Sequence, residues 1–396
     1  MTRALVYDAV RLPRGRVRRS GGTLAQIPPH ALFAQLLTAL EQRGLAAAGV
    51  DEIVLGISTV TGEQGGNLAR AAALSAGWPD AVGGMVVSRL CCSGIEAIGT
   101  AAAKVTAGQV DVVVAGGVES MSRVPMLSDT PAIATDHELG ERTGFVTIGV
   151  SADATAVAHG FTRIELDEFA ARSHRRAAAA PPSDAVVAVK CSGEVILAVD
   201  EGARPDATAQ QFAALPALFD DDLAWERVRR RLPELTRPRS GLHSIATAPQ
   251  LADGASAAVI AGPDAANGRL RGRAPVAEIV AVTHRSVRSP LLSAPVDAAR
   301  DALRRAGIGA GDLDIVEANE SFAVSPLLLI RELGLDPDRV NPTGGAHAVG
   351  HPLGATGGNL LVSALDGLRR VDGEHALVTI PAALGLGSAL ILRRLS

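Results

Sequence analysis

The chain has 396 residues, of which 47% are hydrophobic and 20% charged, a composition that allows a large core and excludes wholesale disorder. Its length predicts two or three packed units rather than one core. The formal net charge of -4 gives no support for a nucleic-acid-binding protein. No apolar run approaches the roughly 20 residues of a membrane helix, so no membrane insertion is expected.

The three cysteines are Cys91, Cys92 and Cys191, and the adjacent pair would form only a strained disulfide. No spacing resembles the disulfide framework of a secreted protein, and residues 1–19 contain no apolar stretch long enough for a signal peptide. A reducing, cytoplasmic location is therefore expected. The nine histidines show no zinc-binding spacing, so no metal site is expected.

Short apolar strands alternate with helices in the first part of the chain. In chain order we expect a strand at 4–7, a helix at 30–43, a strand at 53–57, a helix at 67–76, a strand at 85–87, a turn at 90–94 that opens a helix to about 107, and a strand at 110–115. This alternation predicts an α/β fold with mainly parallel sheets covered by helices.

The last part of the chain repeats this order. We expect a strand at 276–282, a helix at 295–306, a strand at 313–317, a helix at 325–333, a turn at 349–354, a helix at 355–369 and a strand at 376–380. The repeat places the turns that contain Cys91 and His351 at equivalent positions, each at the start of a long helix.

The stretch 121–250 interrupts the alternation. It contains one clear helix at 166–179 and then loops rich in Pro, Asp and Arg, before the first part continues at 251–261. We therefore predict an N-terminal half at 1–120 plus 251–274, an inserted loop domain at 121–250 and a C-terminal half at 275–396. Such an insertion is a natural place for a lid over a substrate.

Two residues at helix starts are candidates for nucleophile and base. Cys91 lies where backbone N–H groups and the helix dipole favour a thiolate, and Cys92 is expected to point away as a packing residue. An imidazole at His351 that faces this cysteine would act as its base. Asn319 follows a strand end, where open sheets place ligand groups. Taken singly, each of these residues also fits a structural role.

Five motifs occur in the order found in one enzyme family. They are GNLAR at 66–70, LCCSG at 90–94, GGVESMS at 116–122, NESFA at 319–323 and GHP at 350–352. The chain resembles the thiolase family in these motifs, which together extend over almost its whole length.

The resemblance implies a fold and a set of roles. The fold would have five layers, built from two similar α/β halves with an inserted loop domain, and would assemble as a homodimer or homotetramer. Cys91 would be acylated by an acyl-CoA, His351 would activate it, and Asn319 would hold a water in a first oxyanion hole. Backbone N–H groups of Cys91 and Ala383 would form a second such hole. Coenzyme A thioesters would be substrates, with no bound cofactor.

One part of the expected site departs from the family pattern. Thiolases of this type carry a second cysteine after the last core strand, and alignment on the glycines at 385 and 387 puts Pro381 at that position. A proline transfers no proton to or from the substrate α-carbon. Ala383 and Leu384 also replace glycines there, which would narrow the site or shift the second oxyanion hole.

Three interpretations of this departure remain open. Another residue supplies the base, for which Ser321 and His347 are the candidates. Alternatively, the acyl-enzyme forms but ends in transfer or hydrolysis without carbon–carbon chemistry. In the third, the chain is a non-catalytic subunit that binds acyl-CoA.

The inserted segment carries possible contacts to coenzyme A. Arg229, Arg230 and Arg231 lie in extra sequence at 220–240, and guanidinium groups pair well with phosphate. Pro249 stands where the family often has a serine against the pantetheine arm. The alternative for the arginine run is a solvated charged face beside the aspartates at 220–222.

Overall fold

The strands of both parts of the chain join in one mixed sheet. The computed structural model describes residues 2–219, 221–270 and 272–395. The sheet strands are β1 (Leu5–Arg11), β2 (Gly15–Arg16), β3 (Glu52–Gly56), β4 (Gly83–Val87), β5 (Val112–Glu119), β8 (Ala252–Ala261), β9 (Ala277–Ser286), β10 (Ile315–Ala318), β11 (His375–Ala382) and β12 (Leu386–Arg394). Their hydrogen-bonded order is β4–β3–β5–β8–β1–β9–β12–β11–β10, and β2 pairs with β8.

A narrow seam divides this sheet into two halves. Only two residue pairs join β1 to β9, Leu5 with Glu278 and Val6 with Ala277. Each half therefore twists largely on its own, and each contains strands from one of the two repeated parts of the sequence.

The expectation of mainly parallel sheets is wrong. Parallel pairing is confined to β3–β4, β3–β5 and β10–β11, whereas β8 and β12 run antiparallel to both of their neighbours. The sequence analysis also missed β12. This strand follows β11 after a turn at 383–385, which is far too short for the crossover that a parallel neighbour requires.

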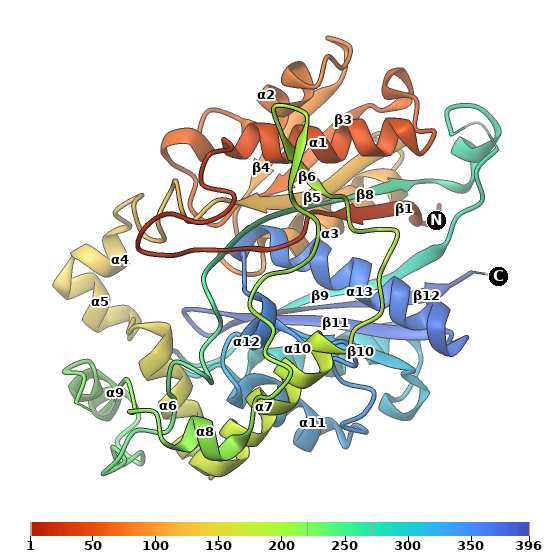
Figure 1. The fold of residues 1–396 in the computed structure, drawn as a ribbon. Coiled ribbons are helices and arrows are strands. Elements are labelled where there is room, and N and C mark those ends of the chain that lie inside the picture. Colours follow the sequence, from red (N-terminus) through yellow and green to blue (C-terminus); the bar gives the residue numbers. More distant parts are fainter. Residues whose placement is uncertain (1, 220, 271, 396) are drawn as a thin grey trace.

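Helices complete five layers around the two half-sheets (Figure 1). α3 (Ser93–Thr106) and α13 (Thr356–Val371) lie between the half-sheets. α1 (Pro29–Gln42) and α2 (Leu68–Ser75) cover the outer face of one, while α10 (Ala294–Ala306) and α11 (Val324–Leu333) cover the outer face of the other. The expected helices and strands are thus confirmed within a few residues.

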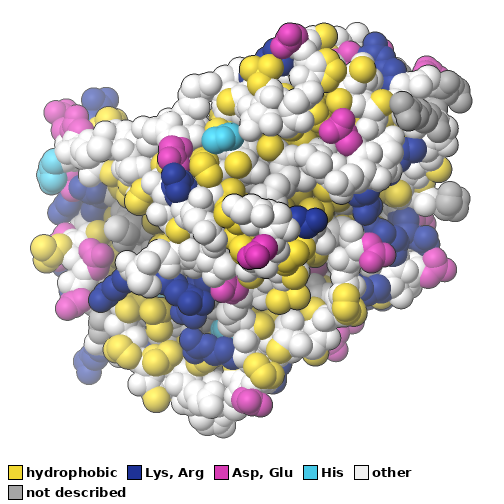
Figure 2. All heavy atoms as spheres, turned by 45° about the horizontal axis from the view of Figure 1, so that its top comes forward, with side chains coloured by type: hydrophobic (Ala, Val, Ile, Leu, Met, Phe, Trp, Pro, Cys, Tyr) yellow, Lys and Arg dark blue, Asp and Glu magenta, His cyan; other side chains and the backbone are white. Residues whose placement is uncertain are grey.

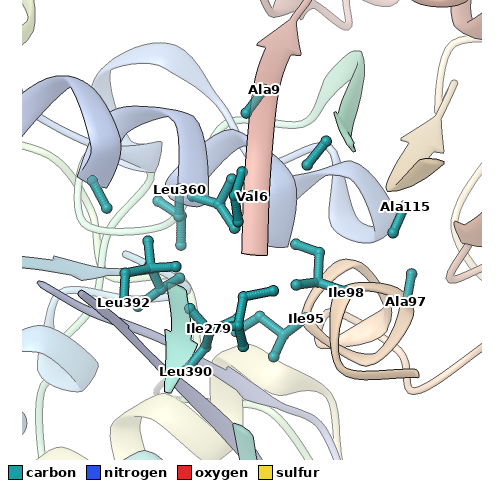
Figure 3. Close-up of a cluster of buried hydrophobic side chains, with 14 of the residues drawn as sticks. Val6, Ala9, Ile95, Ala97, Ile98, Ala115, Ile279, Leu360, Leu390 and Leu392 are labelled. Carbon is teal, nitrogen blue, oxygen red and sulfur yellow. The ribbon is translucent and has the colours of Figure 1, made fainter. Parts of the chain in front are cut away.

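The middle layer is packed by small and branched aliphatic side chains. Figure 3 shows Ile95 and Ile98 of α3 near Val6 of β1 and Ile279 of β9, with Leu360 of α13 beside them. Aromatic residues make up only 3% of the chain, so the helices approach the sheets closely. This close packing holds the starts of α3 and α13 in place.

The stretch between β5 and β8 forms separate elements, drawn in yellow and green beside the layers in Figure 1. They are α4 (Ala132–Thr135), α5 (His137–Thr143), α6 (Ile148–His159), α7 (Arg163–Ala178), α8 (Ala209–Ala213), α9 (Trp225–Arg231) and the hairpin of β6 (Val189–Cys191) and β7 (Glu194–Leu197). α7 is the helix expected at 166–179, and its start is fixed by a capping box between Thr162 and Glu165.

Charged side chains of both signs share the surface. On the face shown in Figure 2, acidic and basic side chains both occur, and several of the basic ones lie together. Within the described residues, no helix is long and apolar enough to cross a membrane.

Candidate active site

The starts of α3 and α13 are in backbone contact. A Cβ on Gly94 would lie 2.7 Å from the carbonyl oxygen of Gly354, and a Cβ on Gly357 would lie 2.3 Å from the backbone nitrogen of Ile95. Only glycine allows this approach. The contact brings together the two turns that precede the helices, which contain Cys91 and His351.

Cys91 is a buried thiol at the first of these turns. It is 7% exposed and follows Leu90, whose φ of 52° places it in the left-handed region. Burial raises the pKa of the Cys91 thiol, and Cys92 and Glu119 raise it further, while the Cys91 backbone N–H acts in the opposite direction. The net shift is therefore opposite to the expected stabilisation of the thiolate, because burial outweighs the effect of this N–H. Acylation of this thiol requires a base.

His351, the residue expected to be that base, is held by two polar neighbours. Its Nδ1 lies 2.7 Å from the Thr356 hydroxyl, and its Nε2 lies 3.4 Å from the Asn319 side-chain nitrogen. Burial, followed by the charge of Arg14, lowers the pKa of His351 to about 3, so the imidazole is neutral at pH 7. If Nδ1 donates to Thr356, Nε2 carries the lone pair that accepts a proton.

Asn319 and Ser321 extend a polar chain from His351 to the end of β11. The Asn319 Nδ2 donates to the Ser321 hydroxyl at 2.7 Å, and that hydroxyl donates to the Pro381 carbonyl at 3.4 Å. The Asn319 backbone N–H is fixed by the Thr379 carbonyl at 2.8 Å. The structure thus brings His351, Asn319 and Ser321 together with Pro381.

Pro381 is a buried residue near the end of β11, opposite Gly387 of β12. In the turn that follows, Ala383 is half-buried and Leu384 has a φ of 63°, a conformation that a leucine adopts only at a cost. The equivalence of Pro381 with the family's second cysteine stays a prediction.

His347 is held on both sides of its ring. Its Nδ1 lies 2.9 Å from Glu320 Oε2, and its Nε2 lies 3.0 Å from the carbonyl oxygen of Thr247. Burial acts to raise the pKa of Glu320, but the charge and hydrogen bonds of His347 lower it to about 2. These contacts give His347 a structural role, whereas Ser321 lies beside Pro381. The assignment of either residue as the substitute base stays a prediction.

Glu119, in the GGVESMS motif, was not identified as a site residue from the sequence. Its buried carboxylate accepts hydrogen bonds from the backbone N–H groups of Ser58 (2.9 Å), Thr59 (3.2 Å) and Gly354 (2.8 Å), and from Gln64 Nε2 (2.7 Å). Gly354 lies in the short 3₁₀ helix η5 (Leu353–Ala355), directly after the His351 turn. Glu119 therefore joins one half of the molecule to the His351 turn of the other.

The residues expected to contact coenzyme A lie in two places. The Arg229–Arg231 run is on α9, where Arg229 pairs with Glu226, Arg230 with Glu141, and the Arg231 Nε donates to the Ser289 carbonyl. Pro249 precedes a segment bound to the His351 turn, since the carbonyl of residue 250 accepts the His351 N–H at 2.9 Å. Their contact with coenzyme A stays a prediction. No cluster of potential metal ligands occurs in the part of the chain that the structure describes.

Comparisons with known proteins identify the family. Residues 4–224 match the family described as "Thiolase, N-terminal domain", and residues 273–394 match "Thiolase, C-terminal domain". The chain belongs to the thiolase family. The resemblance inferred from the five motifs is thereby confirmed.

Individual thiolases match over their full length. The 3-oxoadipyl-CoA/3-oxo-5,6-dehydrosuberyl-CoA thiolase of Escherichia coli K12 is 35% identical over 423 residues, with 100% of each chain covered. The 3-ketoacyl-CoA thiolase of Bacillus subtilis is 32% identical over 409 residues, with 98% of each chain covered. The crystal structure of the Bacillus anthracis acetyl-CoA acetyltransferase superposes with a TM-score of 0.85 at 30% identity, covering 100% of this chain and 99% of that one. The thiolase fold is thus confirmed, and the protein is a thiolase-type acyltransferase that uses coenzyme A thioesters as substrates.

Proposed function

We propose that this thiolase forms an acyl-enzyme on Cys91 and catalyses thiolysis of 3-ketoacyl-CoA or the reverse Claisen condensation. The observation that carries the proposal is the neutral imidazole of His351, oriented by Thr356 at the helix start that contacts the Cys91 helix. In thiolysis its Nε2 takes the proton of Cys91, and the resulting thiolate attacks the 3-keto carbonyl. The bond between C2 and C3 then breaks, and the departing enolate of the smaller acyl-CoA takes up a proton at C2. Transfer of the acyl group to coenzyme A regenerates the thiol.

Two oxyanion holes would stabilise the negative charge that develops on the thioester oxygens. We assign the first to His351 with a water held by Asn319, and the second to the backbone N–H groups of Cys91 and Ala383. Such donors stabilise charge that exists only in the transition state, by about 3 kcal/mol each. The bond between Asn319 and Ser321 supports this assignment, because it orients the amide whose nitrogen lies 3.4 Å from His351.

The substrate class follows from the relatives. Their names specify 3-oxoadipyl-CoA and 3-ketoacyl-CoA, and we propose a 3-ketoacyl-CoA for this chain. The inserted segment would cover the coenzyme, with Arg229–Arg231 near its phosphates and Pro249 beside the pantetheine arm. A cytoplasmic homodimer or homotetramer is part of the same proposal.

Mass spectrometry of the intact protein after mixing with acetyl-CoA and longer acyl-CoAs tests the nucleophile. We expect a mass increase of one acyl group, located on Cys91 by peptide mapping and absent from Cys91→Ala. Cys191→Ala is the matched control, because this half-buried cysteine lies in β6. An adduct that survives Cys91→Ala would refute the assignment. Consumption of a 3-ketoacyl-CoA in the presence of coenzyme A then tests the reaction.

A further inference from the structure

A cavity of about 250 Å³ lies where the inserted segment meets both halves of the molecule. Its walls are formed by the end of β1 and the residues that follow, the end of α7 and the loop to residue 183, the segment 198–203, and α13. Cys91, His351 and Asn319 are not part of its described lining. The cavity is therefore distinct from the residues assigned to acylation.

Backbone hydrogen bonds hold the walls of this cavity together. The Arg11 N–H donates to the Ala185 carbonyl at 2.9 Å, and the Glu201 N–H donates to the Arg14 carbonyl at 3.1 Å. Two stretches of the inserted segment are thus fixed against the residues at the end of β1. A cavity held in this way is preorganised, so a ligand would not have to order its walls on binding.

The charged side chains that line the cavity do not balance. They are the three arginines Arg11, Arg14 and Arg370 and the two aspartates Asp200 and Asp366. Asp200 alone is shared by Arg11 at 2.7 Å and Arg14 at 3.1 Å. Burial lowers the pKa of Arg14 even though the charge of Asp200 acts to raise it. The described lining therefore has an excess of one positive charge, and Arg14 is buried without full compensation.

Two of these arginines have hydrogen-bonding capacity to spare. The side chain of Arg14 is 9% exposed, and it binds Asp200 through Nε and Nη2, which leaves its Nη1 without a partner among the described residues. Arg370 Nη2 lies 4.0 Å from Asp366, too far for a hydrogen bond. Asp366 instead pairs with Arg369 at 3.1 Å. Donors for an anion are therefore present on two walls of the cavity.

A further buried carboxyl interacts with the same arginines without neutralising them. Burial raises the pKa of Glu317 on β10 to about 8, although the charges of Arg14, Arg370 and Arg11 act to lower it. The carboxyl therefore keeps its proton at pH 7, and its Oε1 has no hydrogen-bond partner among the described residues. The excess positive charge of the cavity remains.

The rest of the lining indicates which anion fits. Much of it is aliphatic and includes Pro181, Pro182, Val186, Val199 and Val349. The volume is below the roughly 300–1,000 Å³ of pockets that hold drug-sized ligands, so the ligand is small. A phosphate monoester carries a charge of about −1.5 to −2 near pH 7, more than the excess of one. A carboxylate carries one charge and pairs with guanidinium groups through two oxygens.

We propose that this cavity binds a small aliphatic carboxylic acid, with its carboxylate on Arg14 and Arg370 and its hydrocarbon part against the proline and valine side chains. The site is additional to the one for coenzyme A thioesters and does not depend on acylation of Cys91. A ligand there contacts the inserted segment and both halves at once. Its binding should therefore stabilise the folded protein in proportion to its concentration.

Titration of the full chain with butyrate, followed by saturation-transfer NMR at constant ionic strength, tests the inference. Butyramide has the same size without the charge, and we expect butyrate to bind about tenfold or more tightly than butyramide. Arg370→Ala should weaken butyrate binding by a similar factor. Arg369→Ala is the matched control, because Arg369 is on the same helix and pairs with the same aspartate but does not line the cavity. Its effect should stay within about twofold.

Four results would overturn the inference. Equal affinity for butyrate and butyramide would show that no carboxylate is recognised, and tighter binding of inorganic phosphate would exclude the carboxylate in favour of another anion. Equal losses in Arg369→Ala and Arg370→Ala would indicate only general attraction to surface charge. Displacement of butyrate by coenzyme A would place it in the thioester site. If Arg370→Ala does not fold, Arg14→Gln takes its place, and unchanged binding in the folded variant overturns the inference equally.

Discussion

Replacement of Glu119 is expected to cause a large loss of stability through hydrogen bonds alone. Each carboxylate oxygen accepts two bonds: Oε2 from the N–H groups of Ser58 and Gly354, and Oε1 from Thr59 and Gln64. Ala at this position removes all four partners at once. Gln presents an NH₂ group to two donors, whichever way its amide is turned.

The magnitude follows from the number of donors left unpaired. A buried donor without a partner costs about 1–3 kcal/mol. At the lower value, the four donors around Glu119 give a loss of about 4 kcal/mol for Glu119→Ala. Glu119→Gln leaves two donors unpaired and removes the buried negative charge. Burial disfavours that charge, because burial raises the pKa of the Glu119 carboxyl. A smaller loss of about 2 kcal/mol is therefore expected.

Urea unfolding followed by circular dichroism measures these differences. Glu226→Ala is the control, because that glutamate is 61% exposed and pairs with Arg229 across one helical turn. Its effect should stay below about 1 kcal/mol. A loss of less than 1 kcal/mol for Glu119→Ala, or a larger loss for Glu119→Gln than for Ala, would show that the carboxylate does not hold the two halves together.

Four further outcomes are expected. Cys91→Ala should form no acyl adduct, and an adduct on this variant in peptide maps would exclude Cys91 as the nucleophile. Replacing Arg229–Arg231 with Ala should weaken coenzyme A binding severalfold, and more at low salt. Unchanged affinity in titrations at low salt would show that these arginines form only a solvated charged face. Pro381→Cys should raise the low thiolysis rate expected of the unmodified chain; an unmodified rate of roughly 10 s⁻¹ or more would show that another base already performs this step. Burial raises the pKa of Glu317 from 4.5 to about 8 despite Arg14, so the folded state keeps a proton that the unfolded chain loses. The free energy of unfolding should therefore fall by up to about 5 kcal/mol as pH rises from about 4.5 to 8, and urea unfolding of Glu317→Gln should not show this fall.

Helices with one apolar face and short apolar strands were predictable from the sequence, because their periodicity is local. The helix α6 was missed because it is buried nearly all round, including Asp153, and so lacks a polar face. β12 was missed because the expected strand at 376–380 already closed the repeat, and nothing local marked the turn at 383–385 as a hairpin. The direction of strand pairing also depends on which distant segments of the chain become neighbours in the sheet. Local periodicity contains no information about these long-range contacts.

The site was predictable where its residues lie in contiguous motifs. Cys91, His351 and Asn319 each belong to a short motif, and the structure joins the last two by a side-chain contact of 3.4 Å. Glu119 lies in a motif as well, but its role depends on Gly354, which is 235 residues away.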